Sequence, residues 1–168
     1  MKDALINRRE FLRNLGVIGA GALLSMSPWL SVFSEVVETS GEKCRLAIIG
    51  TGSRGRFLMS FLLQNPKVEI VALCDIYQPS MEKALNLVRE AKVYTDYRKV
   101  LENKTVDAVL VATPLNLHCQ IVLDAFDAGK HVFCEKSIGF TMEECFRIYK
   151  KHISTGKVFF TGQQRLFD

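Results

Sequence analysis

The 168-residue sequence predicts an α/β protein built on a doubly wound parallel sheet. Three observations predict it. Short apolar runs alternate with helical patterns, a glycine-rich turn follows the first run, and a carboxylate ends the second. This alternation is typical of a parallel sheet covered on both faces. Right-handed crossovers then give the strand order 3-2-1-4-5-6, with ligands bound at the carboxyl edge. The expected strands are 45–50, 68–75, 92–94, 106–112, 131–135 and 158–161.

Local signals mark the helices between these strands. The first helix, over about 56–64, is expected to stop before Pro66, because proline disfavours the helical conformation in the residue preceding it. Asp96 is the expected N-cap of a short third helix, and the fourth covers about 117–127. Apolar residues at i, i+3, i+4 and i+7 predict one buried stripe on the second helix, formed by Met81, Ala84, Leu85 and Val88.

The last helix has the most completely specified ends. Thr141 and Glu144, three residues apart, predict a capping box at its start. Phe140 is expected to pack on Cys145 as a hydrophobic staple, and Gly156 is the expected C-terminal cap.

The glycine-rich turn over residues 50–55 is expected to bind the diphosphate of a dinucleotide. Gly50 makes the sharp turn, and Gly52 lets the diphosphate approach the main chain. Gly55 lets the following helix pack closely on the strand, with its N-terminal N–H groups facing the phosphates. Ser53 and Arg54 lie inside the turn and are predicted to contact the cofactor as well.

A carboxylate at the end of the second strand supports this interpretation. Asp75 follows the last glycine by about 20 residues, where it can accept hydrogen bonds from an adenosine ribose. Neither Arg nor Lys stands beside it to meet a 2′-phosphate, so NAD is the predicted cofactor. NADP is the alternative, since Arg54 could reach a phosphate. Asp75 could instead only begin the turn into residues 78–80.

Polar residues follow the fourth strand at the same edge of the sheet. Thr113 and Pro114 are expected to shape the loop under the nicotinamide half of the cofactor. Asn116 and His118 offer polar groups at a helix start, and all four are predicted cofactor-binding residues. The alternative for His118 is an ordinary solvated residue in the first turn of a helix.

The fifth strand ends in two adjacent charged residues, Glu135 and Lys136, which should emerge where chemistry occurs in such sheets. An amine held in a cleft suits proton exchange with a substrate hydroxyl. Both residues are predicted to contact the cofactor, and the alternative is an ordinary charge pair between a strand and a helix. Residues 162–165, just past the last strand, could touch the cofactor or begin a linker.

Composition narrows the class of protein further. The chain is 48% hydrophobic and 24% charged, and its net charge of +4 without a basic run in the body does not suggest a nucleic-acid partner. The cysteines show no metal-ligand spacing, so no metal site is predicted. We interpret them as small core residues rather than disulfides: Cys44, Cys74, Cys119, Cys134 and Cys145.

Residues 1–40 are predicted to form a leader, and residues 41–168 form the sheet domain. Arg8 and Arg9 precede an uncharged stretch over 15–33, which is similar to a twin-arginine export signal. This predicts a location in the periplasm or at the outer face of the inner membrane, with membrane contact only through the leader. A membrane anchor, or an ordinary amphipathic start on a cytoplasmic protein, is the alternative.

Together these motifs resemble the Gfo/Idh/MocA oxidoreductases over about residues 44–165. The residues that carry the resemblance are Gly50-x-Gly52-x-x-Gly55, Cys74-Asp75, Thr113-Pro114-x-x-x-His118 and Gly129-Lys130-His131-Val132-x-x-Glu135-Lys136. The resemblance implies an N-terminal Rossmann domain that binds NAD or NADP. It also implies a C-terminal α/β domain that binds a sugar, inositol or related polyol, with Lys136 as the catalytic lysine of a Glu-Lys-Pro motif.

Two features depart from the family's pattern. Ser137 stands where the family usually has proline, and the sequence ends at Asp168, where the substrate domain should begin. The chain alone is therefore expected to bind cofactor without turnover, and homo-oligomers are expected only with the missing domain. Three other functions stay open: an NAD-dependent glycosidase of the same fold, a non-catalytic dinucleotide-binding fragment, and a methyltransferase that uses S-adenosylmethionine.

Overall fold

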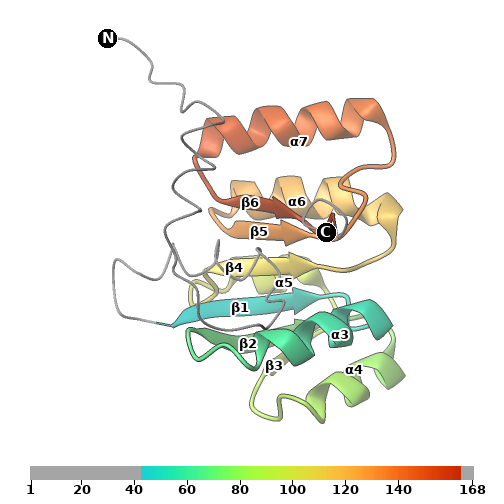
Figure 1. Cartoon of the computed structure of the whole chain (residues 1–168), viewed down its shortest axis with the longest axis vertical. Coiled ribbons are helices and arrows are strands. Elements are labelled where there is room, and N and C mark those ends of the chain that lie inside the picture. Colours follow the sequence, from blue (N-terminus) through green and yellow to red (C-terminus); the bar gives the residue numbers. More distant parts are fainter. Residues whose placement is uncertain (1–42, 164–168) are drawn as a thin grey trace, which may run out of the picture.

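A single six-stranded parallel sheet with helices on both faces forms the body of the computed structural model, which describes residues 43–163 (Figure 1). The strand order is β3-β2-β1-β4-β5-β6, which confirms the prediction. The predicted leader and residues 164–165 lie outside the described range. The strands are β1 (Cys44–Ile49), β2 (Val68–Cys74), β3 (Lys92–Tyr94), β4 (Ala108–Val111), β5 (His131–Cys134) and β6 (Phe159–Thr161).

The helices fall between the strands as the alternation predicts. They are α3 (Ser53–Leu62), α4 (Gln78–Leu85), α5 (Tyr97–Glu102), the 3-10 helix η1 (Leu115–Leu117), α6 (His118–Asp127) and α7 (Met142–Thr155). Helix α3 begins three residues earlier than the predicted start at 56, because Gly52 serves as its N-cap and the helix grows directly from the glycine turn. Among residues 43–163, no helix combines the length and apolar character needed to cross a bilayer.

Two apolar clusters hold the layers together, one on each face of the sheet. Successive side chains of a strand point to opposite faces, so β1 contributes Leu46 and Ile48 to one cluster and Ala47 and Ile49 to the other. Helices α3 and α4 cover the first face, whereas α5, α6 and α7 cover the second. Because both faces are buried, the central strands are mostly apolar, as in other parallel sheets; Arg45 of β1 is a charged exception and is only partly buried.

Helix α7 begins and ends as its sequence predicts. The Thr141 hydroxyl accepts the Glu144 N–H at 3.2 Å, and the Glu144 carboxylate accepts the Thr141 N–H at 3.3 Å. Gly156 adopts a left-handed φ of +63° at the C-cap. The expected staple is not found, since Phe140 is 69% exposed. Its N–H instead donates to the Glu144 carboxylate at 2.6 Å, which holds the chain at the helix start without burying the ring.

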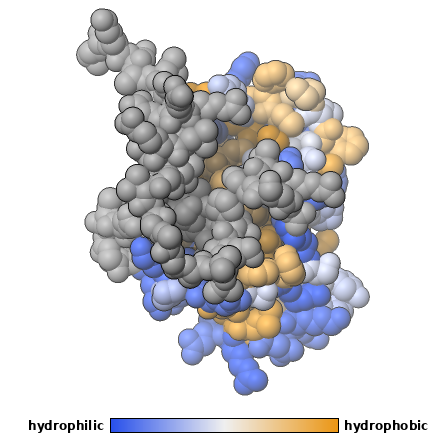
Figure 2. Space-filling model, in the orientation of Figure 1, coloured by the Kyte–Doolittle hydropathy of each residue, from blue (hydrophilic) through white to orange (hydrophobic). Residues whose placement is uncertain are grey.

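Hydrophobic surface gathers toward α7, whereas the end of the molecule near α4 is mostly hydrophilic (Figure 2). On α7, Met142, Phe146 and Ile153 are 71%, 58% and 60% exposed, although Ile148 on the inner face is fully buried. The helix is therefore apolar on two sides, and only the inner one packs against the sheet.

The cysteines behave as small core residues. Four of the five are buried, Cys145 is partly buried, and all are free thiols. Burial raises the pKa of Cys44 to about 11 and that of Cys74 to about 12, so these thiols stay protonated at neutral pH. No group of three His, Cys, Asp or Glu side chains within the described part of the chain is arranged to hold a metal ion.

The attachment of β6 to the sheet is expected to weaken below neutral pH. Val158 N–H, just before this strand, donates to His131 Nδ1 at 3.0 Å, and a proton on Nδ1 would remove that acceptor. Burial, together with the nearby Lys157 charge, lowers the pKa of His131 from 6.5. The unfolded chain therefore takes up a proton first, so the contribution of His131 to stability is complete above pH 6.5 and falls as the pH drops toward the lowered value.

Urea unfolding between pH 8 and 5 measures this effect. In His131→Asn the side-chain carbonyl still offers an acceptor but does not titrate, so the unfolding free energy should fall less steeply below pH 6.5 than in the parent chain. Equal slopes in the two proteins would contradict the assignment. Subtracting one profile from the other isolates the contribution of His131.

Candidate functional site

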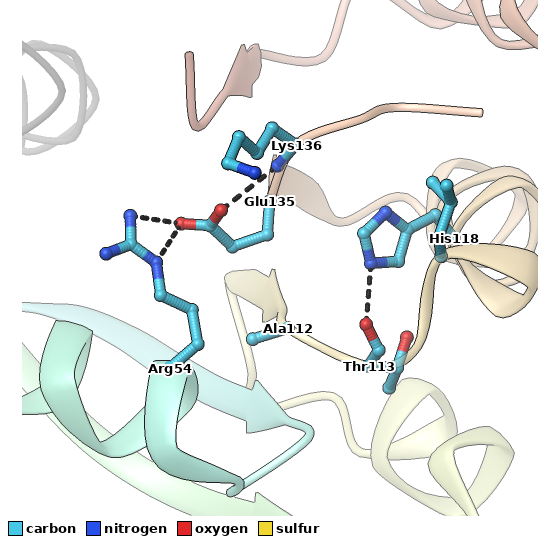
Figure 3. Close-up of a pocket in the computed structure, with 7 residues that line it drawn as sticks. Arg54, Ala112, Thr113, His118, Glu135 and Lys136 are labelled. Carbon is cyan, nitrogen blue, oxygen red and sulfur yellow. Dashed lines mark hydrogen bonds and ion pairs between the residues drawn. The ribbon is translucent and has the colours of Figure 1, made fainter. Parts of the chain in front are cut away.

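A cavity of about 300 Å³ lies at the carboxyl edge of β4 and β5 (Figure 3). Three parts of the chain form its wall: the start of α3, the segment from the end of β4 to the start of α6, and the end of β5. Ligands of open parallel sheets bind at this edge. The lining residues are Arg54, Ala112, Thr113, Leu115, His118, Glu135 and Lys136.

The glycine turn beside the cavity is too tightly packed for side chains at two of its three glycines. Gly50 has φ +93°, and a Cβ there would lie 2.6 Å from the Ala112 carbonyl. A Cβ at Gly55 would lie 2.1 Å from the Gly50 oxygen. At Gly52, a Cβ would meet no described atom within 4 Å. The first and third glycines therefore close the turn, and the second leaves open space in front of the main chain, as a bound diphosphate requires.

Asp75 supports the glycine turn from the neighbouring strand. One carboxylate oxygen accepts the Thr51 N–H at 2.7 Å and the Thr51 hydroxyl at 3.0 Å. The other accepts the Tyr77 N–H at 2.9 Å. A carboxylate has about four acceptor positions, so one remains for a ribose hydroxyl. The predicted ribose contact and the alternative of a turn former are thus both compatible with this geometry.

Thr51 is a site residue that the sequence analysis missed. It is fully buried, and its carbonyl accepts a hydrogen bond from Arg56 Nη1 at 2.6 Å. A threonine between two glycines gives no signal of its own, because its partner Asp75 is 24 residues away.

Arg54 crosses the cavity to the end of β5. Its guanidinium contacts Glu135 Oε1 through Nε at 2.7 Å and Nη2 at 2.6 Å. Glu135 is 5% exposed, and its second oxygen accepts the Lys136 N–H at 3.1 Å. Because β2 and β4 flank β1 on opposite sides, Arg54 extends away from Asp75. It is therefore not positioned to meet a 2′-phosphate near Asp75, which agrees with NAD as the cofactor.

Gly162 makes room for the Glu135 carboxylate. A Cβ at this buried glycine would lie between 2.9 and 3.1 Å from the three carboxylate atoms. The sequence allows residues 162–165 either to touch the cofactor or to begin a linker, and the structure gives Gly162 a packing role at the site. Gln163 is exposed.

The residues after β4 divide into two groups. Thr113 and His118 line the cavity, whereas Asn116 is exposed in η1 and Pro114 is the N-cap of that helix. Ser53, at the start of α3, is also exposed. The alternative of a solvated His118 is wrong, because its side chain is 1% exposed. Fewer of the predicted cofactor-binding residues therefore line the cavity than the motif suggested.

One buried polar atom at the cavity is available to bind a ligand. The Thr113 hydroxyl lies below the surface and finds no hydrogen-bond partner among the residues the structure describes. A buried polar group left unpaired costs about 1–3 kcal/mol, and Thr113 lines the cavity. Together with the open space at Gly52 and the N–H groups at the start of α3, it matches the polar groups of a dinucleotide.

Comparison with known proteins agrees with this geometry. Residues 44–163 match the family described as an oxidoreductase family with an NAD-binding Rossmann fold. A glycosyl hydrolase family 109 protein of Stenotrophomonas maltophilia is 34% identical over 163 residues, which covers 90% of this chain and 34% of that protein. An alpha-N-acetylgalactosaminidase of Shewanella oneidensis is 30% identical, over 85% of this chain and 36% of that protein.

A solved structure shares both fold and sequence with the chain. The myo-inositol dehydrogenase of Lactobacillus casei, in complex with NAD(H) and myo-inositol, has 33% identity and a TM-score of 0.71. The match covers 75% of this chain and 38% of that one. The chain thus spans little more than a third of the length of these relatives.

Proposed function

Because the chain belongs to the oxidoreductase family with an NAD-binding Rossmann fold, we propose that it is the cofactor half of an enzyme that oxidises a sugar, inositol or related polyol. The observation that carries the proposal is the open space at Gly52, next to a cavity lined by Lys136. The inositol dehydrogenase that shares the fold supports this class of substrate.

Each part of the site has a role in this proposal. The glycine turn and the start of α3 would hold the diphosphate, while the free acceptor position of Asp75 would hold the adenosine ribose. Thr113 borders the nicotinamide half of the site. When NAD is bound, its nicotinamide ring supplies the hydride acceptor. The Lys136 amine takes or returns the proton of the substrate hydroxyl.

A second function uses the same residues in another order. An NAD-dependent glycosidase would oxidise the sugar transiently, eliminate the leaving group, add water to the resulting unsaturated ketone, and reduce the product again, with no net change in the cofactor. The names of two relatives, a family 109 glycosyl hydrolase and an alpha-N-acetylgalactosaminidase, favour this alternative. A full-length protein containing this chain would release the phenol of an aryl glycoside without forming net NADH if it were a glycosidase.

Equilibrium titration of the 168-residue chain tests whether it binds NAD⁺, on which the whole proposal depends. We expect saturable binding of NAD⁺, weaker binding of NADP⁺ because Asp75 would face the 2′-phosphate, and none of S-adenosylmethionine. Calorimetry measures all three. Absence of NAD⁺ binding even at millimolar concentrations would overturn the proposal, while preference for S-adenosylmethionine would favour a methyltransferase.

A further inference from the structure

His118 lies between two loops that form opposite walls of the cavity (Figure 3). It is the first residue of α6, and its side chain is 1% exposed. Burying a polar ring is unfavourable unless its nitrogens find partners. Complete burial at a helix start therefore points to a specific role for the ring.

Both ring nitrogens contact main-chain carbonyl oxygens. Nδ1 lies 2.7 Å from the Ser137 oxygen, and Nε2 lies 2.9 Å from the Thr113 oxygen. A carbonyl oxygen only accepts, so each contact is a hydrogen bond when that nitrogen carries a proton. A neutral ring carries one such proton, so each tautomer donates to one of the two carbonyls while the other nitrogen lies against the second. His118 thus contacts two separate segments of the chain through its two nitrogens.

These two carbonyl groups lie just beyond the point where β4 and β5 separate. The Glu135 N–H still donates to the Val111 carbonyl at 2.9 Å, at the end of the strand ladder. Thr113 comes two residues after Val111, and Ser137 comes two residues after Glu135. His118 therefore bridges the two loops directly past the last bond of the sheet.

We propose that His118 is a positioning residue, which fixes the main chain at Ser137 relative to Thr113 and thereby sets where the Lys136 amine stands. The inference rests on the proposed function, because that function gives Lys136 its role. His118 acts through the backbone of its neighbours rather than on the reacting atoms. A residue that only filled space in the core would use neither nitrogen.

Hydrogen exchange in the 168-residue chain tests the bridge itself. His118→Phe keeps an aromatic ring and removes both ring nitrogens, so amides over 136–139 should exchange at least about tenfold faster while those of β1 stay unchanged. His118→Gln, whose amide carries two N–H groups, should restore slower exchange. The matched control is His152→Phe, a ring on α7 that packs between Phe126 and Phe159, and it should leave 136–139 unaffected.

A measurement on the parent chain covers the case in which His118→Phe does not fold. A ring N–H proton of His118 should appear in NMR spectra as a slowly exchanging signal, because the ring is buried and its nitrogens lie against carbonyl oxygens. Ring protons that exchange as fast as those of free histidine would overturn the proposal, as would unchanged exchange over 136–139 in a folded His118→Phe.

Turnover by the full-length protein distinguishes a positioning role of His118 from a role in protein stability alone. His118→Phe should lower kcat with a much smaller change in KM for NAD⁺, and it should lower kcat no further when Lys136 is already alanine. Additive losses in the two backgrounds would overturn a role through Lys136. Failure of the parent chain to bind NAD⁺ would instead refute the proposed function, and it would leave the exchange result unchanged.

Discussion

Gly52→Ala should fold as well as the parent chain and yet bind NAD⁺ at least about tenfold more weakly, a change of about 1.4 kcal/mol. The added Cβ meets no described atom within 4 Å, and the backbone φ of −56° is one that alanine adopts freely. The methyl group instead occupies the space through which the diphosphate approaches the main chain. Calorimetry with NAD⁺ and urea unfolding measure the two quantities separately.

Gly55→Ala provides the contrast. Its Cβ would lie 2.1 Å from the Gly50 oxygen, so α3 or the turn must shift. Overpacking of this kind costs about 1–3 kcal/mol, and both stability and NAD⁺ affinity should fall. Ser60→Ala, on the exposed side of α3, is the control and should change neither. Unchanged affinity in Gly52→Ala would show that the diphosphate does not lie against this turn.

Lys136→Ala should produce the largest loss of turnover in a full-length protein. General acid–base groups contribute about 10²- to 10⁴-fold to the rate, so kcat should fall within this range. The affinity for NAD⁺ should change much less, because in the proposed site the glycine turn and Asp75 would hold the other half of the cofactor. Steady-state kinetics, with calorimetry on the same protein, measure both.

Lys150→Ala is the matched control for this prediction. Lys150 lies on the exposed face of α7, so removing its amine should leave kcat unchanged. Turnover close to normal in Lys136→Ala would mean that another group handles the substrate proton.

The sequence predicts the architecture well, because its signals are local or depend on general rules. Strand order follows from the alternation of strands and helices together with right-handed crossovers. The capping box of α7 needs only Thr141 and Glu144, which are three residues apart. The start of helix α3 is harder to predict. Its first turn lies within the glycine motif, where the spacing of apolar residues does not indicate a helix.

The contacts within the site are harder to predict, because their partners are distant in the sequence. Arg54 and Glu135 are 81 residues apart, and nothing near either residue identifies the other. The burial of His118 depends on the carbonyl of Ser137, 19 residues later. Main-chain acceptors carry no signature in the sequence, so this contact could be found only in the structure.

The link between Asp75 and Thr51 has a consequence for redesigning the coenzyme preference. Replacing the acid with a small apolar residue, to admit a phosphorylated ribose, would also release the N–H and hydroxyl of Thr51. The loop proposed to receive the diphosphate would then lose its support, and affinity for both coenzymes would decline together. An engineer seeking an NADP-specific variant should therefore keep a neutral acceptor, as in Asp75→Asn, and add a cation elsewhere.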